Sequence, residues 1–295
     1  LIYLVIGWKH FDDYARTRNL PRDPSATPAQ HAAWVEEVDF QIMEEHRARV
    51  DSIVNDPRTA EALKPYYRYM CKRPCFHDEY LAAFNNPNVV LVDCPAGIER
   101  VTEKGLLVDG REIELDCIVY ATGFEPEVTP LPRRVRHTVT GRDGITLREK
   151  WGEGAASLWG MTSSGFPNMF VMPAPGQQAV VTVNYTHITM EGAEHIAGVI
   201  TSLEAAGVEW FDITTEAEDG WCHGVIDRYV DASRIMALCT PSRLNNEGHP
   251  ETMLPRNGNF GRCLGDFFGY RQVLADWRER GDFEGFELHP RGAGS

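Results

Sequence analysis

DCIVYATGF, residues 116–124, is the stretch of sequence that decides the expected fold. Cys117 to Tyr120 form an apolar run with no polar break, which is typical of a strand buried on both faces in a parallel α/β sheet. Thr122 and Gly123 then form a turn whose small residues let a neighbouring strand, a loop or a bound cofactor approach the backbone closely. An ordinary core strand followed by an ordinary turn would produce the same run. The stretch therefore predicts an α/β fold but, taken alone, no function.

Two further motifs accompany this stretch. KRPCFHDEYL spans residues 72–81, with Phe84-Asn85 and Pro87-Asn88-Val89 behind it. GFPNMF spans residues 165–170 and is followed by VNYTH at residues 183–187. In their order and spacing, the three motifs resemble those of flavin-dependent monooxygenases of the Baeyer–Villiger type, the class B flavoprotein monooxygenases. The resemblance covers roughly residues 35–290.

The resemblance implies a flavoprotein fold with two dinucleotide-binding domains, a helical insertion and a C-terminal helical extension. It assigns residues 1–85 to the end of the NADP-binding domain, 86–206 to the returning part of the FAD-binding domain, and 207–295 to the extension. The glycine-rich Gly-x-Gly-x-x-Gly fingerprint expected after a first strand is absent from the sequence, and the chain starts at Leu1 inside an apolar run. We therefore expect an incomplete fold that corresponds to the C-terminal part of the family.

Composition excludes several function classes. A hydrophobic content of 43% and a charged content of 24% are those of a globular protein, and the net charge of −14 disfavours nucleic acid and anionic membranes as partners. No apolar run approaches the ~20 residues that cross a bilayer. The odd count of seven cysteines, with Cys71 and Cys75 as a CxxxC pair, favours reduced thiols in the cytoplasm. No cluster has the ligand spacing of a zinc site, and no oligomeric state follows from the sequence.

Local patterns predict most of the secondary structure. Thr27-Pro28-Ala29-Gln30 is a capping box, so a long helix should start there. Asp109-Gly110 predicts a hairpin turn between antiparallel strands within residues 97–115. Further helices are expected at 56–65, 78–84, 186–206, 215–235 and 267–277, further strands at 89–92 and 169–172, and a long loop at 239–263.

Arg73 is the expected catalytic residue. The resemblance implies that this arginine lies over the flavin, where a negatively charged flavin–oxygen adduct must persist long enough to attack a carbonyl. A guanidinium is always charged and offers a planar fork of donors, and a fixed cation in a dry site stabilises such charge strongly. Without the motif around it, the pair Lys72-Arg73 would be interpreted as a solvated basic pair.

The expected cofactor-binding residues are Lys72, Ala121, Thr122, Gly123 and Asn184. By the resemblance, Lys72 meets the 2′-phosphate of NADPH, a role that suits a compact point charge. The Ala121–Gly123 turn lies near the junction of the flavin and nicotinamide domains. Asn184 lies where the chain returns to the flavin, although simple helix capping explains an asparagine there equally well.

The function that the resemblance implies is enzymatic. An FAD- and NADPH-dependent monooxygenase would insert one oxygen atom of O2 next to the carbonyl of a small-molecule ketone and give an ester or lactone. One alternative is a flavin monooxygenase that oxygenates nitrogen or sulfur. Another is a cofactor-free binding or interaction module derived from such an enzyme, which the missing fingerprints favour. As a part of the full enzyme, the chain alone could be inactive.

Overall fold

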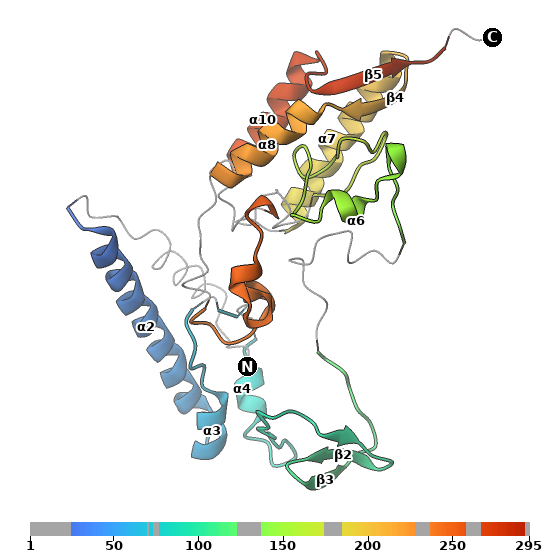
Figure 1. Cartoon of the computed structure of the whole chain (residues 1–295). Coiled ribbons are helices and arrows are strands. Elements are labelled where there is room, and N and C mark those ends of the chain that lie inside the picture. Colours follow the sequence, from blue (N-terminus) through green and yellow to red (C-terminus); the bar gives the residue numbers. More distant parts are fainter. Residues whose placement is uncertain are drawn as a thin grey trace. The chain divides into compact units, whose positions relative to one another are not determined.

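The computed structural model describes residues 25–69, 71–72, 77–122, 137–173, 185–227, 237–257 and 267–292, which fall into two compact units (Figure 1). Unit 1 comprises Leu1–Phe124 and Leu238–Leu244, and unit 2 comprises Glu125–Ala237 and Asn245–Ser295. These units describe packing, and the division at residues 85 and 206 into cofactor domains remains a prediction. No helix within the described ranges is long and apolar enough to span a bilayer.

Local signals set the helices of unit 1. Helix α2 (Pro28–Ile53) begins with the predicted capping box, in which the Thr27 hydroxyl accepts from the Gln30 amide at 3.3 Å and Gln30 Oε1 accepts from the Thr27 amide at 2.9 Å. Asp56 caps α3 (Pro57–Leu63) by accepting from the Thr59 amide at 2.8 Å. With the short α4 (Tyr80–Ala83), these helices bury a shared apolar cluster: Val50, Val54, Ala60, Leu63 and Leu81.

A three-stranded antiparallel sheet completes unit 1, with β1 (Arg100–Val101), β2 (Gly105–Val108) and β3 (Arg111–Glu114) in that order. Asp109 and Gly110 connect β2 to β3 with φ values of 49° and 71°. Two successive positive φ values are those of the tight hairpin turn that Asp-Gly favours. The hairpin prediction is confirmed.

The two apolar stretches of unit 1 that were expected as strands, residues 117–120 as a buried one and residues 89–92, do not form strands. Both stretches lie outside the sheets that the structure describes, and Val119, Tyr120 and Val90 are 83%, 75% and 79% exposed. A strand needs a neighbour to accept its backbone hydrogen bonds, and the described residues place none beside either stretch. The strands that the structure describes pair antiparallel, so the parallel sheet expected around residues 116–124 is not formed by them.

Unit 2 is built around an aromatic core between helices and a two-stranded sheet. Helices α7 (Tyr185–Ala205), α8 (Thr215–Asp227) and α10 (Phe267–Arg280) pack with the antiparallel pair β4 (Val208–Ile213) and β5 (Phe286–Pro290). The core residues are Leu158, Trp159, Met161, Val199, Leu203, Val208, Phe211, Ile213, Tyr270, Leu274 and Trp277. The helix predictions are confirmed where described, whereas β4 and β5 were not anticipated.

Two local predictions in unit 2 are wrong. Residues 169–172 form no strand: Met169 N donates to Phe166 O within a turn at 3.2 Å, and Val171 N donates to Met161 O at 2.8 Å outside any strand. The capping box expected at residues 215–218 is absent as well. Thr214 Oγ1 accepts instead from the Ala217 amide at 3.1 Å, while Glu218 turns into the interior.

Short helical turns fill the remainder of unit 2. The 3₁₀ helix η1 (Arg142–Gly144) precedes α6 (Leu147–Lys150), and a second core surrounds Trp151 with Leu147, Ala155, Ala156 and Phe166. The long segment after Cys239 contains only the 3₁₀ helices η2 (Arg243–Gly248), η3 (Pro250–Thr252) and η4 (Pro255–Asn257) in its described part. The irregular segment predicted from its glycine, proline and asparagine content is confirmed as far as residue 257.

Candidate functional site

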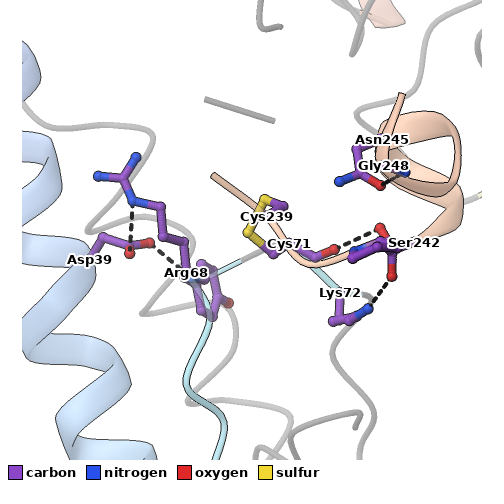
Figure 2. The surroundings of a disulfide bond; sticks show 10 residues. Asp39, Arg68, Cys71, Lys72, Cys239, Ser242, Asn245 and Gly248 are labelled. Carbon is purple, nitrogen blue, oxygen red and sulfur yellow. Dashed lines mark hydrogen bonds and ion pairs between the residues drawn. A yellow bond between two sulfur atoms is a disulfide. The ribbon is translucent and has the colours of Figure 1, made fainter. Parts of the chain in front are cut away.

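Lys72 is the charged residue of the candidate site that the structure describes. It is half-buried, and its Nζ donates a hydrogen bond to Pro241 O at 2.5 Å. Pro241 belongs to Leu238–Leu244, a segment of unit 1 although the chain on both sides of it belongs to unit 2. Figure 2 shows this segment beside Cys71 and Lys72, more than 160 residues away in the sequence.

A disulfide bond lies directly next to Lys72. Cys71 pairs with Cys239, with a Cα–Cα distance of 5.3 Å and a sequence separation of 168 residues (Figure 2). The expectation of uniformly reduced cysteines is therefore wrong, and the partner of Cys71 is not Cys75. A bond across such a separation leaves no signal in the spacing of cysteines. Because the argument for the cytoplasm used reduced thiols, the cellular location stays a prediction.

Charged residues fix the turn that leads into Cys71. Cys71 N donates to Arg68 O at 3.1 Å, and Tyr69 N donates to Asp39 Oδ1 at 2.9 Å. Arg68 also pairs with Glu36 at 2.6 Å and approaches Asp39 Oδ2 at 4.0 Å. Burial raises the pKa of Asp39 to about 6, against the opposing effects of Arg68 and the Tyr69 amide. These contacts hold Arg68 and Tyr69 against α2 and fix Cys71 to Arg68.

The structure describes three of the six predicted site residues. Lys72 is placed as above, and Ala121 and Thr122 are exposed at the end of the unpaired stretch 117–120. Arg73, Gly123 and Asn184 lie outside the described residues. The contact of Lys72 with Pro241 was not anticipated from the sequence.

A buried carboxylate anchors the turn before the GFPN motif in unit 2. Glu218 Oε2 accepts from the Ser164 amide at 2.7 Å and from Ser163 Oγ at 3.0 Å, and Glu218 Oε1 lies 2.7 Å from Lys150 Nζ. The Glu218 residue is 2% exposed, so all three contacts lie in a water-poor region. The spacing of Glu218 from Cys222 and Val225 places it on the buried face of α8, a signal that sequence reasoning missed.

The GFPN motif itself is fixed to β4. Asp212, which is 3% exposed, accepts from the Gly165 amide at 3.1 Å and pairs with Arg142 at 3.3 Å. Asn168 Oδ1 accepts from Phe211 N at 3.0 Å, and Asn168 N donates to Phe211 O at 3.0 Å. The motif that carried the resemblance is thus a rigid structural turn. Phe166 is 4% exposed within it, so it is a core residue in the described structure.

The fit to cofactor groups differs between the two expected cofactors. A lysine beside a fixed turn, as at Lys72, fits a phosphate group, since lysine binds phosphate as a point charge. The FAD pyrophosphate requires a glycine-rich turn at a helix start. The sequence contains no Gly-x-Gly-x-x-Gly segment, so this chain does not supply that cradle.

The comparisons with known proteins find monooxygenases that are similar to nearly the whole chain. It is 41% identical over 268 residues to pentalenolactone D synthase of Streptomyces exfoliatus. The matched region covers 90% of this chain and 45% of that protein. It is 41% identical over 261 residues to a Baeyer–Villiger monooxygenase of Streptomyces coelicolor, covering 88% and 42%. The chain is a relative of the Baeyer–Villiger monooxygenases. The resemblance stated from the three motifs is confirmed.

Solved structures give the same result. A polycyclic ketone monooxygenase from Thermothelomyces thermophila matches with a TM-score of 0.79 at 30% identity, over 97% of this chain and 51% of that one. A complex of OTEMO with FAD and NADP matches with a TM-score of 0.60 at 25% identity, over 86% of this chain and 45% of that one. The chain spans about half the length of the curated relatives it matches. The sequence matches no protein-family model.

Proposed function

We propose that the chain forms part of an FAD- and NADPH-dependent Baeyer–Villiger monooxygenase. The reaction would insert one oxygen atom of O2 between a ketone carbonyl and its neighbouring carbon to give an ester or lactone. Ketone, O2, NADPH and a proton would yield the ester, water and NADP⁺, so the two electrons come from NADPH. The observation that carries the proposal is the similarity of nearly the whole chain to a polycyclic ketone monooxygenase.

The proposed roles of the individual residues follow the resemblance. Lys72 would bind the 2′-phosphate of NADPH, and its half-buried position at a fixed turn supports this role. Arg73, the next residue, would stabilise the negative charge that develops on oxygen. Ala121–Gly123 would connect the cofactor domains, and Asn184 would present backbone donors to the flavin ring. FAD, when bound, supplies the activation of O2 that no amino-acid side chain provides.

Replacement of Arg73 tests the proposal. Because the chain spans about half of its relatives, the assay uses a chimera that joins it to the part of the Streptomyces coelicolor relative that it does not match. The chimera is expected to convert a cyclic ketone to its lactone, as measured by mass spectrometry. Arg73→Ala should lower kcat by about 10²–10³-fold, the usual cost of removing one charge-stabilising donor. Arg111→Ala is the matched control, since Arg111 is exposed on β3, and should leave kcat unchanged.

The two rival functions give different results in the same assay. A nitrogen- or sulfur-oxygenating enzyme would form a sulfoxide from a thioether, form no lactone, and tolerate Arg73→Ala. An interaction module would leave the chimera without visible flavin absorbance after addition of FAD. Either result would refute the proposed reaction.

A further inference from the structure

The segment Leu238–Leu244 is attached to unit 1 through two adjacent residues. Cys71 forms the disulfide with Cys239, and its carbonyl oxygen accepts from Ser242 Oγ at 3.0 Å (Figure 2). Lys72 Nζ donates to Pro241 O at 2.5 Å. A covalent bond and two hydrogen bonds therefore converge on the same turn. Of these attachments the disulfide is the one that a change of redox state can break.

The two cysteines differ in their accessibility. Cys71 is 1% exposed, whereas Cys239 is half-buried and lies between the exposed residues Leu238 and Thr240. Thiol–disulfide exchange requires a thiolate to reach a disulfide sulfur, so access decides which sulfur is attacked. Cys239 is consequently the sulfur open to attack, and Cys71 is the leaving thiolate.

The other cysteines indicate that this bond is not part of a disulfide scaffold. Cys117 is an exposed free thiol and Cys94 a half-buried one, so described thiols at the surface of unit 1 remain unpaired. Small extracellular scaffolds pair their cysteines throughout, whereas among the described cysteines of this chain one disulfide stands beside free thiols, which suits a redox-sensing bond. The position next to Lys72 gives such a bond a direct structural consequence.

We propose that Cys71–Cys239 is a thiol–disulfide exchange site that acts as a redox-sensitive clasp on Leu238–Leu244. A dithiol attacks Cys239 Sγ, and the S–S bond breaks with Cys71 leaving as a thiolate. The second thiol of the same reagent then displaces Cys239, so both cysteines are reduced and the dithiol is oxidised to its cyclic disulfide. The freed segment loses its fixed position at Lys72, and the affinity for the 2′-phosphate of NADPH changes. This last consequence rests on the proposed function.

The clasp is tested by hydrogen exchange on the full chain with and without dithiothreitol under native conditions. Reduction should free two additional thiols, located by alkylation at Cys71 and Cys239. Exchange in Leu238–Leu244 should accelerate about tenfold or more, as expected for a segment released from a folded unit. Cys239→Ser should show the fast exchange without reductant, and Cys117→Ser, the free-thiol control, should behave like the parent protein. A bond that resists reduction until the protein unfolds, or unchanged exchange after reduction, would overturn the proposal.

Nucleotide titration tests the consequence for Lys72 separately. In the chimera, dithiothreitol should weaken NADPH binding several-fold and leave NADH, which lacks the 2′-phosphate, unchanged. Equal effects on both nucleotides, or no effect on either, would refute the link to Lys72. A chimera that binds no NADPH in either state would refute the proposed cofactor role, while the exchange experiment still decides the clasp.

Discussion

The stability of unit 2 should fall when His195 is forced to accept a proton. His195 lies on α7 and is fully buried, with ring centroids 4.8 Å from Trp159 and 5.6 Å from Trp277. Its Nδ1 lies 3.1 Å from a guanidinium nitrogen of Arg278, and since arginine only donates, Nδ1 is the acceptor. Burial first, and then the charge of Arg278, lower the pKa of His195 from 6.5 to about 4. Glu194, 3.9 Å from Arg278, is the nearby acidic side chain.

The magnitude follows from the two pKa values. Between pH 6.5 and about 4 the unfolded chain binds a proton at His195 that the folded chain does not. The free energy of unfolding therefore decreases as the pH falls, by about 1.4 kcal/mol per pH unit and by about 3 kcal/mol over the whole window. Below pH 4 the folded state binds the proton as well, and the loss stops.

Asp39 should have the opposite effect on unit 1. Burial raises its pKa from 3.8 to about 6, so the folded state binds a proton that the unfolded chain lacks between these values. The free energy of unfolding of unit 1 should increase as the pH falls through this window, by about 2 kcal/mol after allowance for solvent screening. The two effects nearly cancel in a global measurement, but they act on different units.

Hydrogen exchange resolved by peptide separates the two units. After correction for the intrinsic pH dependence of exchange, protection of α7 should decrease between pH 6.5 and 4, while protection of α2 should increase. His195→Gln should remove the slope in α7 only, and Asp39→Asn the slope in α2 only. Protection of α7 that is independent of pH in the parent protein, or an unchanged slope in His195→Gln, would refute the electrostatic reasoning.

Three further substitutions, two of them with a matched control, test a buried network, a strand pairing and a helix cap by urea unfolding. Glu218→Ala should lower the free energy of unfolding by about 3–5 kcal/mol, because it leaves the partly buried Lys150 and the Ser164 amide without their partner. Glu216→Ala, at an exposed position of α8, should change it by less than about 0.5 kcal/mol. Equal effects would contradict the buried network. Gly105→Ala should disrupt the β2–β3 pairing, since an added Cβ would lie 1.9 Å from the backbone oxygen of Ile113. It should lower the free energy of unfolding clearly more than Gly110→Ala, where nothing lies within 4 Å of an added Cβ. At Gly110 only the positive φ opposes alanine, at about 1–2 kcal/mol, so the reverse order would disprove the steric argument. Thr27→Ala should cost about 1 kcal/mol by loss of the cap, and no change would show that the start of α2 does not contribute to stability.

Sequence reasoning succeeded where the decisive interactions are local. The capping box at Thr27 and Gln30 lies within four residues, and the turn at Asp109-Gly110 needs only its own backbone conformation. Such signals depend only on the types of a few neighbouring residues, which the sequence gives directly. The resemblance to Baeyer–Villiger monooxygenases also rested on contiguous motifs, and the relatives confirm it.

Interactions between distant residues were missed. Strands β4 and β5 pair Phe211 with Leu288. β4 lacks strict alternation, and β5 alternates apolar and polar residues over only the four positions from Phe286 to His289. The disulfide joins cysteines 168 residues apart, and the position of Lys72 depends on the segment that this bond brings to it. Half of the predicted site residues lie outside the described residues, so their roles stay predictions.

The wrong strand predictions carry information of their own. Residues 117–120 were predicted to form a buried strand because their apolar run suits a sheet covered on both faces, and residues 89–92 were predicted to form a strand. In the described structure neither stretch forms a strand, and Val90, Val119 and Tyr120 are each at least 75% exposed. Large apolar side chains in an extended backbone gain free energy only when a second surface removes them from water and pairs their amides. The apolar pattern therefore indicates side chains that suit a buried environment, which the described residues do not provide. The chain spans about half the length of the curated relatives it matches.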